Sequence, residues 1–475
     1  MKKIFLLLIA AALLVFGQNT PVSAAQGDIP MELYFQHGGM EDFMGNGFYR
    51  AGALWVPGQI LRVMGVNLED GPNNKGYNLP ISNPAQVFGA PVLESLCGSS
   101  LSLYFSSLSV SGISYFNVTG MEKLLKLNYT RQENRVVFTA NDSTEAAAAL
   151  SLPPAPHSGR LNLVWEHVTL NNPDLGAMQP IAGLDVLSPT WFNLMDANGG
   201  CANRASAAFI ASAHKKGYRV WPLVSNSFNG QLTTAFFKNA RGMNLFYARL
   251  IAYAKLYGFS GYNFDFEGIN ESHREAFTRF MSRAGELLSA EGLTISVDTL
   301  IPSQKSSSAK AYDRAALARS CDYLMLMAYD EHWRTSPRAG SVASMPWVTK
   351  AVETTLAEGV PASKLVLGIP FYMRRWEETP TGSGVKVKAS TLSMAEAEAL
   401  AAKTGAPMSW LEREGQHYFS YQANGKTYKV WVENAASISR KLELVKKYGL
   451  AGVAGWRRGF EKPELWKTIA DQLEK

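Results

Sequence analysis

Eight short apolar segments, separated by stretches with helical periodicity, organise the chain from residue 161 onward. Apolar runs that alternate with helical patterns, such as those at 203–216, 271–290 and 434–448, are typical of βα units in a parallel sheet. Eight such units over about 315 residues predict an α/β fold, a (β/α)8 TIM barrel, across 161–475. The expected strands are 161–168, 185–190, 219–225, 261–267, 293–299, 322–329, 364–370 and 450–456.

The connection from the seventh to the eighth expected strand is longer than one βα unit needs. Within it, Asn424 and Gly425 lie between two runs of alternating aromatic residues, a pattern that predicts a β-hairpin. We therefore expect a small α+β insertion after strand 7, at about 371–433, that walls one side of a cleft at the mouth of the barrel.

Side chains alternate in character along the fourth expected strand. One face would carry aromatic residues against packed helices, and the other would bury polar residues unless it opens onto a pocket. The aromatic set is Tyr262, Phe264 and Phe266, and the polar set is Asn263, Asp265 and Glu267. Asp265 and Glu267 would lie about 6.6 Å apart along a strand. A like charge so close raises the pKa of one carboxyl, as an acid catalyst near neutral pH requires.

This strand resembles the catalytic strand of glycoside hydrolase family 18, the chitinase-type barrels, whose signature reads Asp-x-x-Asp-x-Asp-x-Glu. The last two positions match at Asp265 and Glu267, whereas Ser260 and Asn263 occupy the first two. The departure at Asn263 is similar to the branch of the family that acts on bacterial spore cortex and other peptidoglycan.

Other expected strand ends carry segments that resemble motifs of the same family. Met327–Asp330 matches its Met-x-Tyr-Asp motif, and Leu367–Arg374 is similar to its Gly-x-Pro-x-Tyr segment. Gly455–Trp456 matches its terminal Trp, and Leu187–Phe192 is typical of the peptidoglycan-acting branch. Because reacting residues of a TIM barrel lie at the C-terminal ends of its strands, these motifs would converge on one site.

The resemblance implies hydrolysis with retention, in which the substrate's own 2-acetamido group is the nucleophile. Glu267 would be the general acid and then the general base, Asp265 would hold the acetamido N–H, and Tyr329 would bind the acetamido oxygen. Asn263 can donate a hydrogen bond to Asp265 but cannot exchange a proton. No metal or cofactor is implied. The expected substrate-binding residues are Asn263, Asp330, Trp456, Arg374 and Trp333, with Trp347 and Trp376 as candidates for further subsites.

Three functions are compatible with these motifs. The leading one is a glycosidase that cleaves N-acetylglucosamine linkages in peptidoglycan. The second is a chitinase or an endo-N-acetylglucosaminidase that acts on other glycans. The third is a non-catalytic, chitinase-like sugar-binding protein, a class that usually lacks the acidic residue present here as Glu267.

The first 25 residues predict a secretory signal peptide. Lys2 and Lys3 precede an apolar run over 4–16, and Val22-Ser23-Ala24 or Ser23-Ala24-Ala25 provides a small-x-small cleavage site. The run is too short to span a bilayer, and no later stretch reaches that length. We therefore expect a bacterial protein that is secreted or held at the cell envelope without a transmembrane anchor.

Residues 26–140 contain an internal repeat in which each unit reads strand, short helix, strand, turn, strand. Leu54–Pro57 aligns with Tyr115–Val118, and Tyr77 aligns with Phe138. This small α+β repeat domain resembles the module named after the N-terminal domain of copper amine oxidases. No copper-ligand cluster accompanies it, which argues against a copper oxidase.

A Pro-rich linker is expected at 141–160, and it indicates that the N-terminal domain is an autonomous unit. We expect this domain to be dispensable for the chemistry and to help retain the protein on the cell wall. The net charge of +6 comes from basic residues that are spread along the chain. It allows weak attraction to an anionic wall and argues against nucleic-acid binding.

Overall fold

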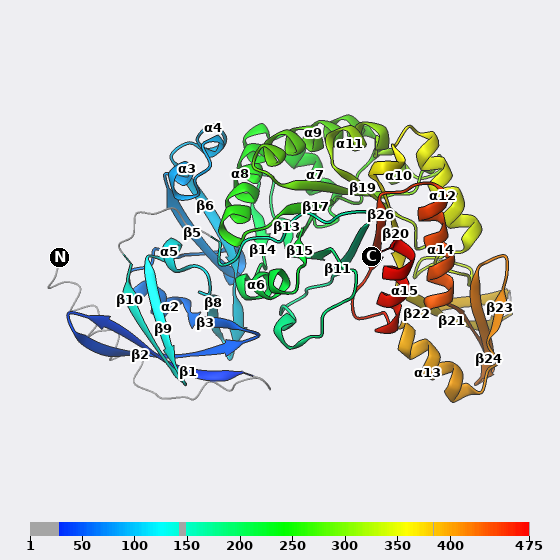
Figure 1. Ribbon diagram of the computed structural model, residues 1–475, viewed down its shortest axis with the longest axis horizontal. Helices are drawn as coiled ribbons and strands as arrows, with labels where there is room; N and C mark the ends of the chain where they lie inside the picture. Colours follow the sequence, from blue (N-terminus) through cyan, green and yellow to red (C-terminus); the bar gives the residue numbers. More distant parts are fainter. Residues whose placement is uncertain (1–27, 142–148, 383, 475) are drawn as a thin grey trace.

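The computed structural model describes residues 28–141, 149–382 and 384–474. The predicted signal peptide and part of the predicted linker lie outside the described residues. Figure 1 shows a central barrel with an N-terminal β-rich domain against one side and a smaller α+β layer on the other. Within the described residues, each helix lacks the combination of length and apolar content that crossing a bilayer requires.

All eight predicted segments form strands of a closed parallel barrel, which confirms the predicted fold class. The third segment contributes two short strands around Pro222, one paired with the second barrel strand and the other with the fourth. The last strand pairs with both the seventh and the first and closes the ring. The barrel strands are β11 (Leu161–Glu166), β12 (Val186–Pro189), β15 (Arg219–Val220) with β16 (Leu223–Ser225), β17 (Gly261–Asp265), β18 (Thr294–Leu300), β19 (Tyr323–Met327), β20 (Leu365–Pro370) and β26 (Gly452–Trp456).

Helices surround the barrel, and a short hairpin of β13 (Phe192–Leu194) and β14 (Cys201–Asn203) extends its sheet beside β16. Asn229, Asn239 and Asp313 accept hydrogen bonds from first-turn N–H groups of three helices, which satisfies otherwise unpaired donors. The helices are α6 (Ala207–Lys215), α7 (Gly230–Phe237), α8 (Ala240–Tyr257), α9 (Arg274–Ala290), α10 (Ser307–Lys310), α11 (Arg314–Ser320), α12 (Met345–Ala357), α14 (Ala435–Lys447) and α15 (Glu464–Leu473), with 3-10 turns at Leu175–Ala177, Glu271–His273 and Ala362–Lys364.

The two faces of β17 lie in different environments, as its sequence predicts. Tyr262, Phe264 and Phe266 are fully buried against the outer helices. The Tyr262 hydroxyl donates to the carbonyl of Leu250 on α8 over 2.7 Å, and the Phe266 ring stacks on Phe280 of α9 at 5.3 Å. This aromatic layer anchors β17 from behind, so its opposite face can present polar groups to the barrel mouth.

The connection after β20 forms a five-stranded sheet with one helix, beside the barrel mouth. Asn424 and Gly425 both adopt the left-handed conformation, with φ of 51° and 68°, in a two-residue turn between paired strands, which confirms the predicted hairpin. The sheet order is β22-β21-β25-β24-β23. Its elements are β21 (Tyr372–Thr381), β22 (Gly384–Ser393), α13 (Met394–Thr404), β23 (Ser409–Leu411), β24 (Gln416–Ala423) and β25 (Lys426–Val432).

A buried ion pair joins the end of this insertion to α14. The Lys441 ammonium lies 2.9 Å from both carboxylate oxygens of Glu433, and both side chains are fully buried. Gln416 and Ser437 donate further hydrogen bonds to Glu433. Such a pair is costly to break, because removing one partner leaves an uncompensated buried charge.

The N-terminal domain combines a seven-stranded sheet, ordered β7-β8-β3-β2-β1-β10-β9, with the three-stranded sheet β4-β5-β6. One strand-helix-strand-strand order occurs twice, as β3–α2–β4–β5 and β8–α5–β9–β10. The elements are β1 (Ile29–His37), β2 (Met40–Arg50), β3 (Ala53–Pro57), α2 (Gly58–Val63), β4 (Glu69–Asp70), a 3-10 turn (Pro72–Asn74), β5 (Gly76–Ser82), α3 (Pro84–Val87), α4 (Val92–Cys97), β6 (Ser100–Ser106), β7 (Leu108–Val110), β8 (Ile113–Asn117), α5 (Glu122–Leu125), β9 (Leu127–Gln132) and β10 (Arg135–Ala140).

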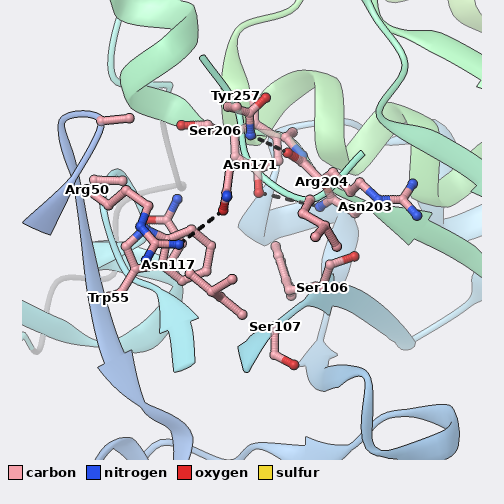
Figure 2. Close-up of a pocket in the computed structure, with 17 residues that line it drawn as sticks. Arg50, Trp55, Ser106, Ser107, Asn117, Asn171, Asn203, Arg204, Ser206 and Tyr257 are labelled. Atoms are coloured by element: carbon pink, nitrogen blue, oxygen red, sulfur yellow. Dashed lines mark hydrogen bonds between the residues drawn. The ribbon is translucent and has the colours of Figure 1, made fainter. Parts of the chain in front are cut away.

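The N-terminal domain packs directly on the barrel, a contact that the linker composition does not predict. The hydroxyl of Tyr253 on α8 donates to the carbonyl of Tyr104 over 2.8 Å and accepts from its N–H over 3.0 Å. A small cavity of about 60 Å³ lies along the same boundary. There, Arg50 of β2 donates to Asn171 of the barrel over 3.2 Å (Figure 2). The domain therefore has a defined position beside the barrel mouth.

Candidate active site

A cavity of about 1290 Å³ opens at the C-terminal ends of the barrel strands, the face on which TIM barrels carry their active sites. It draws side chains from the barrel, from β21 of the insertion and from the N-terminal domain. Residues that line it include Pro72, Asn73, His167, Asp196, Arg204, Asp265, Glu267, Asp298, Tyr329, Asp330, Tyr372, Arg374 and Trp456. We call this cavity the cleft.

Glu267 lies two residues beyond the end of β17 and lines the cleft. Its backbone is held at both ends by Asn226, a fully buried residue just after β16. The Glu267 N–H donates to the Asn226 side-chain oxygen over 3.0 Å, and the Asn226 amide donates to the Glu267 carbonyl over 2.6 Å. The carboxyl is therefore presented by a fixed backbone. Sequence reasoning missed Asn226, for which the only signal is a polar residue directly after a strand.

Asp265 ends β17 and is 6% exposed. Among the described residues its Oδ1 atom has no hydrogen-bond partner. Leaving a buried acceptor unpaired costs about 1–3 kcal/mol, so such groups call for an explanation. Because Asp265 lines the cleft, an N–H group of a bound ligand is a suitable partner for this oxygen.

Asn263 lies beneath the cleft rather than in it. Its side chain is fully buried, and its amide donates to Asp298 over 2.7 Å and to Ser296 over 3.0 Å. Its oxygen accepts from the Trp165 indole over 2.8 Å. The expected hydrogen bond from Asn263 to Asp265 is wrong, because both amide hydrogens are used by residues on β18. Asn263 positions Asp298 instead.

The pKa values of three carboxyl groups at the cleft floor are raised. Burial raises the pKa of Asp265 well above its usual range, and the charges of Glu267 and Asp298 raise it further. Burial also raises the pKa of Asp298, against the hydrogen bond from Asn263. The pKa of Glu267 is raised by burial and then by Asp330. The predicted effect of neighbouring like charges is thus present, but burial is the larger cause at each group.

Asp330, Tyr329 and Arg374 meet beside Glu267. Asp330 adopts the left-handed conformation, with φ of 60°, and its carboxylate accepts from the Tyr372 hydroxyl and, over 2.9 Å, from Arg374. Left-handed backbone in a non-glycine residue is a strained feature that clusters at functional sites. Burial raises the pKa of Tyr329 well above its usual range, so its hydroxyl stays protonated and can donate.

The predicted tryptophans take different places. Trp456 lines the cleft beside Trp165, at 5.9 Å between ring centroids. Trp333 is 51% exposed and is not among the residues that line the cleft. Trp347 lines a separate cavity of about 430 Å³. The expectation for Trp376 is wrong, because it is fully buried and donates to the carbonyl of Gly340 over 2.8 Å.

Of the predicted site residues, the structure brings six together at the cleft: Glu267, Asp265, Tyr329, Asp330, Arg374 and Trp456. Within residues 28–141, 149–382 and 384–474, no group of three or more His, Cys, Asp or Glu side chains is arranged to hold a metal ion. The arrangement offers a carboxyl of raised pKa, a second carboxyl with an acceptor atom that has no partner among the described residues, and an aromatic surface. These groups suit acid catalysis on a sugar that carries an amide.

Comparison with known sequences agrees with this geometry. The family profile described as "Glycosyl hydrolases family 18" matches residues 195–461, more than half of the chain. The uncharacterized glycosylase YvbX of Bacillus subtilis is 28% identical over 286 residues, which are 57% of this chain and 80% of that protein. The cortical fragment-lytic enzyme of Bacillus subtilis is 30% identical over 229 residues, which are 47% of this chain and 52% of that enzyme. The match thus spans about half of the cortical enzyme.

Comparison with solved structures supports the same fold. The spore cortex-lytic enzyme SleL of Bacillus megaterium superimposes with a TM-score of 0.60 at 22% identity, over 72% of this chain and 78% of that one. At this identity the likeness concerns the barrel fold alone.

Proposed function

The chain belongs to the glycosyl hydrolases family 18, and we propose that within this family it hydrolyses N-acetylglucosamine linkages of peptidoglycan. Membership makes it a glycoside hydrolase, and the names of its relatives favour cell-wall or chitin-like glycans as the substrate. The observation that carries the proposed chemistry is that Glu267 and the unpaired Asp265 oxygen both line the cleft, an arrangement that suits any glycan with an N-acetylated sugar. Relatives named as cortical fragment-lytic and spore cortex-lytic enzymes support peptidoglycan as the substrate.

In the proposed first step, the Glu267 carboxyl gives its proton to the glycosidic oxygen, and the bond from that oxygen to C1 breaks. The carbonyl oxygen of the substrate's 2-acetamido group forms a new bond to C1, which gives an oxazolinium ion. Asp265 accepts a hydrogen bond from the acetamido N–H at its unpaired Oδ1 atom. Burial and the charge of Asp330 raise the pKa of Glu267, which favours the protonated form that this step requires.

In the second step, the Glu267 carboxylate removes a proton from a water molecule, and the water oxygen bonds to C1. The oxazolinium ring opens, the acetamido group is restored, and the configuration at C1 is retained because two displacements have occurred. Glu267 ends the cycle protonated, as it began. General acid–base catalysis of this kind contributes roughly 10²–10⁴-fold to the rate.

Neighbouring residues hold the sugar during these steps. The Tyr329 hydroxyl, which its raised pKa keeps protonated, donates to the acetamido oxygen. Trp456 provides an apolar surface for the sugar ring. Asp330 and Arg374, joined over 2.9 Å, contact sugar hydroxyls, and the Asp330 charge raises the pKa of Glu267.

A chitinase or an endo-N-acetylglucosaminidase is the second candidate. The residues assigned to the chemistry bind only the acetamido group and the scissile oxygen, which chitin and peptidoglycan share. The choice between them therefore depends on other parts of the cleft. Mass spectrometry of the products from purified peptidoglycan and from chitin oligomers distinguishes the two candidates.

We also propose that residues 1–25 direct export and that the N-terminal domain helps retain the protein on the cell wall. Export would place the enzyme beside peptidoglycan. The retention proposal is tested by sedimenting Glu267→Gln protein with insoluble peptidoglycan in the presence of increasing salt. Absence of the protein from the pellet at low salt contradicts it.

The mechanism is tested with the acetamido group itself. A de-N-acetylated sugar offers an amine, which cannot form an oxazoline, so hydrolysis should stop at glucosamine units. A thiazoline mimic of the intermediate should inhibit. If de-N-acetylated wall is cut as fast as acetylated wall and the thiazoline fails to inhibit, the substrate-assisted mechanism is wrong here.

A further inference from the structure

One wall of the cleft carries a cation, Arg204, whose counter-ion is not found among the described residues. Arg204 follows β14 and is half-buried, and it lines both the cleft and the small cavity beside the N-terminal domain. In the part of the chain that the structure describes, its guanidinium forms no ion pair or side-chain hydrogen bond. Figure 2 shows the Arg204 side chain extending away from Arg50 and Asn171.

The surroundings of this guanidinium do not neutralise it. Burial lowers the pKa of Arg204, and the one opposing influence is the hydroxyl of Tyr104. The pKa of His167, another cleft residue, is lowered by burial and by the charges of Arg457 and Arg204. A half-buried charge without a partner is destabilising, and an anionic group of a ligand would offset that cost.

The N-terminal domain completes the wall around Arg204. The Tyr104 hydroxyl donates to the carbonyl of Lys75 over 2.9 Å, and a Cβ atom at Gly71 would lie 2.6 Å from the Tyr104 ring. The turn that follows Gly71 is therefore packed tightly on Tyr104. This packing places Pro72 and Asn73 on the same cleft that Arg204 lines.

We propose that Arg204, with the Pro72–Asn73 turn beside it, forms a subsite for a carboxylate-bearing substituent of the glycan. The inference rests on the proposed peptidoglycan function. Alternate sugars of peptidoglycan carry a lactyl ether whose carboxylate is free or extended by a peptide that ends in a carboxylate, whereas chitin is neutral. A guanidinium binds a carboxylate through two parallel hydrogen bonds. The subsite therefore distinguishes peptidoglycan from chitin, which the residues that bind the acetamido group cannot do.

The test uses the full chain and three substrates. These are glycan strands stripped of peptides, the same strands with their lactyl carboxylates converted to neutral methylamides, and a chitin oligomer. Arg204→Gln should raise KM for the acidic strands by roughly 10- to 100-fold, the range for a lost charge-assisted pair. It should leave kcat and the KM for both neutral substrates unchanged. Arg319→Gln removes an equal charge from an exposed position on α11 and should change nothing, whereas Arg204→Lys should restore part of the loss.

Binding gives an independent readout. In a Glu267→Gln background, Arg204→Gln should weaken the binding of acidic strands and leave that of the methylamide strands unchanged, without lowering the melting temperature. Equal effects on acidic and neutral strands, or no effect on either, overturn the proposal. If the wild-type enzyme cuts only chitin oligomers, the peptidoglycan function fails, and the binding comparison still tests Arg204.

Discussion

The side-chain amide of Asn263 donates a hydrogen bond of 2.7 Å to the Asp298 carboxylate on the neighbouring strand. The second amide hydrogen of Asn263 is donated to Ser296. The amide therefore has no hydrogen left for Asp265, which lies two residues further along β17. Asp265 consequently keeps an unpaired oxygen on the cleft floor. Asp298 thus receives a hydrogen bond from the protein itself, whereas one oxygen of Asp265 is available to pair with the substrate.

Replacing Glu267 by Gln removes the only group placed to protonate the glycosidic oxygen in the proposed mechanism. We expect turnover to fall by at least about 10²-fold with little change in melting temperature, because the backbone of residue 267 is held by Asn226. Glu275→Gln, on the exposed face of α9, is the matched control. Turnover within tenfold of wild type would remove Glu267 from the acid role.

Asp265 should make the protein less stable as pH rises. Its pKa is raised in the folded state, so above the ordinary aspartate value of about 3.9 the folded protein binds more protons than the unfolded chain. The free energy of unfolding then falls with increasing pH. Asp265→Asn removes this titration, so its gain in melting temperature over wild type should be larger near pH 8 than near pH 4. A gain that is independent of pH would contradict the raised pKa.

The charge of Asp330 should extend the activity to higher pH. Asp330 raises the pKa of Glu267, although burial contributes more, and Glu267 must be protonated to act as an acid. Asp330→Asn removes the charge, so the alkaline limb of the kcat profile should move to lower pH. An unchanged or upward-shifted limb would argue against this coupling. Arg374→Gln removes a hydrogen-bond donor to Asp330 but leaves the charge of Asp330 in place. This variant therefore distinguishes the effect of losing the Asp330 charge from the effect of displacing the Asp330 side chain.

Asn226 should act as a positioning residue for Glu267. Asn226→Ala removes both hydrogen bonds to the Glu267 backbone, and a displacement of about 1 Å can reduce the rate about 10²-fold. We expect kcat to fall by roughly 10- to 100-fold with little change in KM. Thr233→Val, which removes another hydrogen-bond partner of Asn226, serves as the comparison. A loss confined to KM, or to stability alone, would refute the positioning role.

The buried pair of Glu433 and Lys441 should be costly to break. Lys441→Met leaves the Glu433 carboxylate without its partner, and we expect a loss of about 3–5 kcal/mol in the free energy of unfolding. The double variant with Glu433→Gln should recover part of that loss, because no unpaired charge is then buried. Lys447→Met, at an exposed site of the same helix, should have little effect. Denaturant unfolding of the four proteins checks this.

The local features of this protein follow from short stretches of sequence. The aromatic and polar faces of β17 depend only on the alternation of side chains along a strand, and the hairpin at Asn424-Gly425 depends only on the backbone freedom of two residues. The barrel follows from the repetition of one local pattern eight times. Glu267, Asp265 and Tyr329 can be identified from the sequence because they lie at or near the C-terminal ends of two of these expected strands.

Contacts between segments that are far apart in the sequence cannot be predicted from local patterns and are seen only in the tertiary structure. Asn226 reaches Glu267 across 41 residues, a pairing that exists only because the third and fourth barrel strands are neighbours. Trp376 resembles a subsite residue in sequence, but the fold buries it. Arg204 and Asn73 line one cleft because the N-terminal domain packs on α8 through Tyr104 and Tyr253, and nothing local to either segment encodes that packing. Periodicity along the chain is a property of the backbone, whereas the composition of the cleft wall depends on how separately formed elements pack.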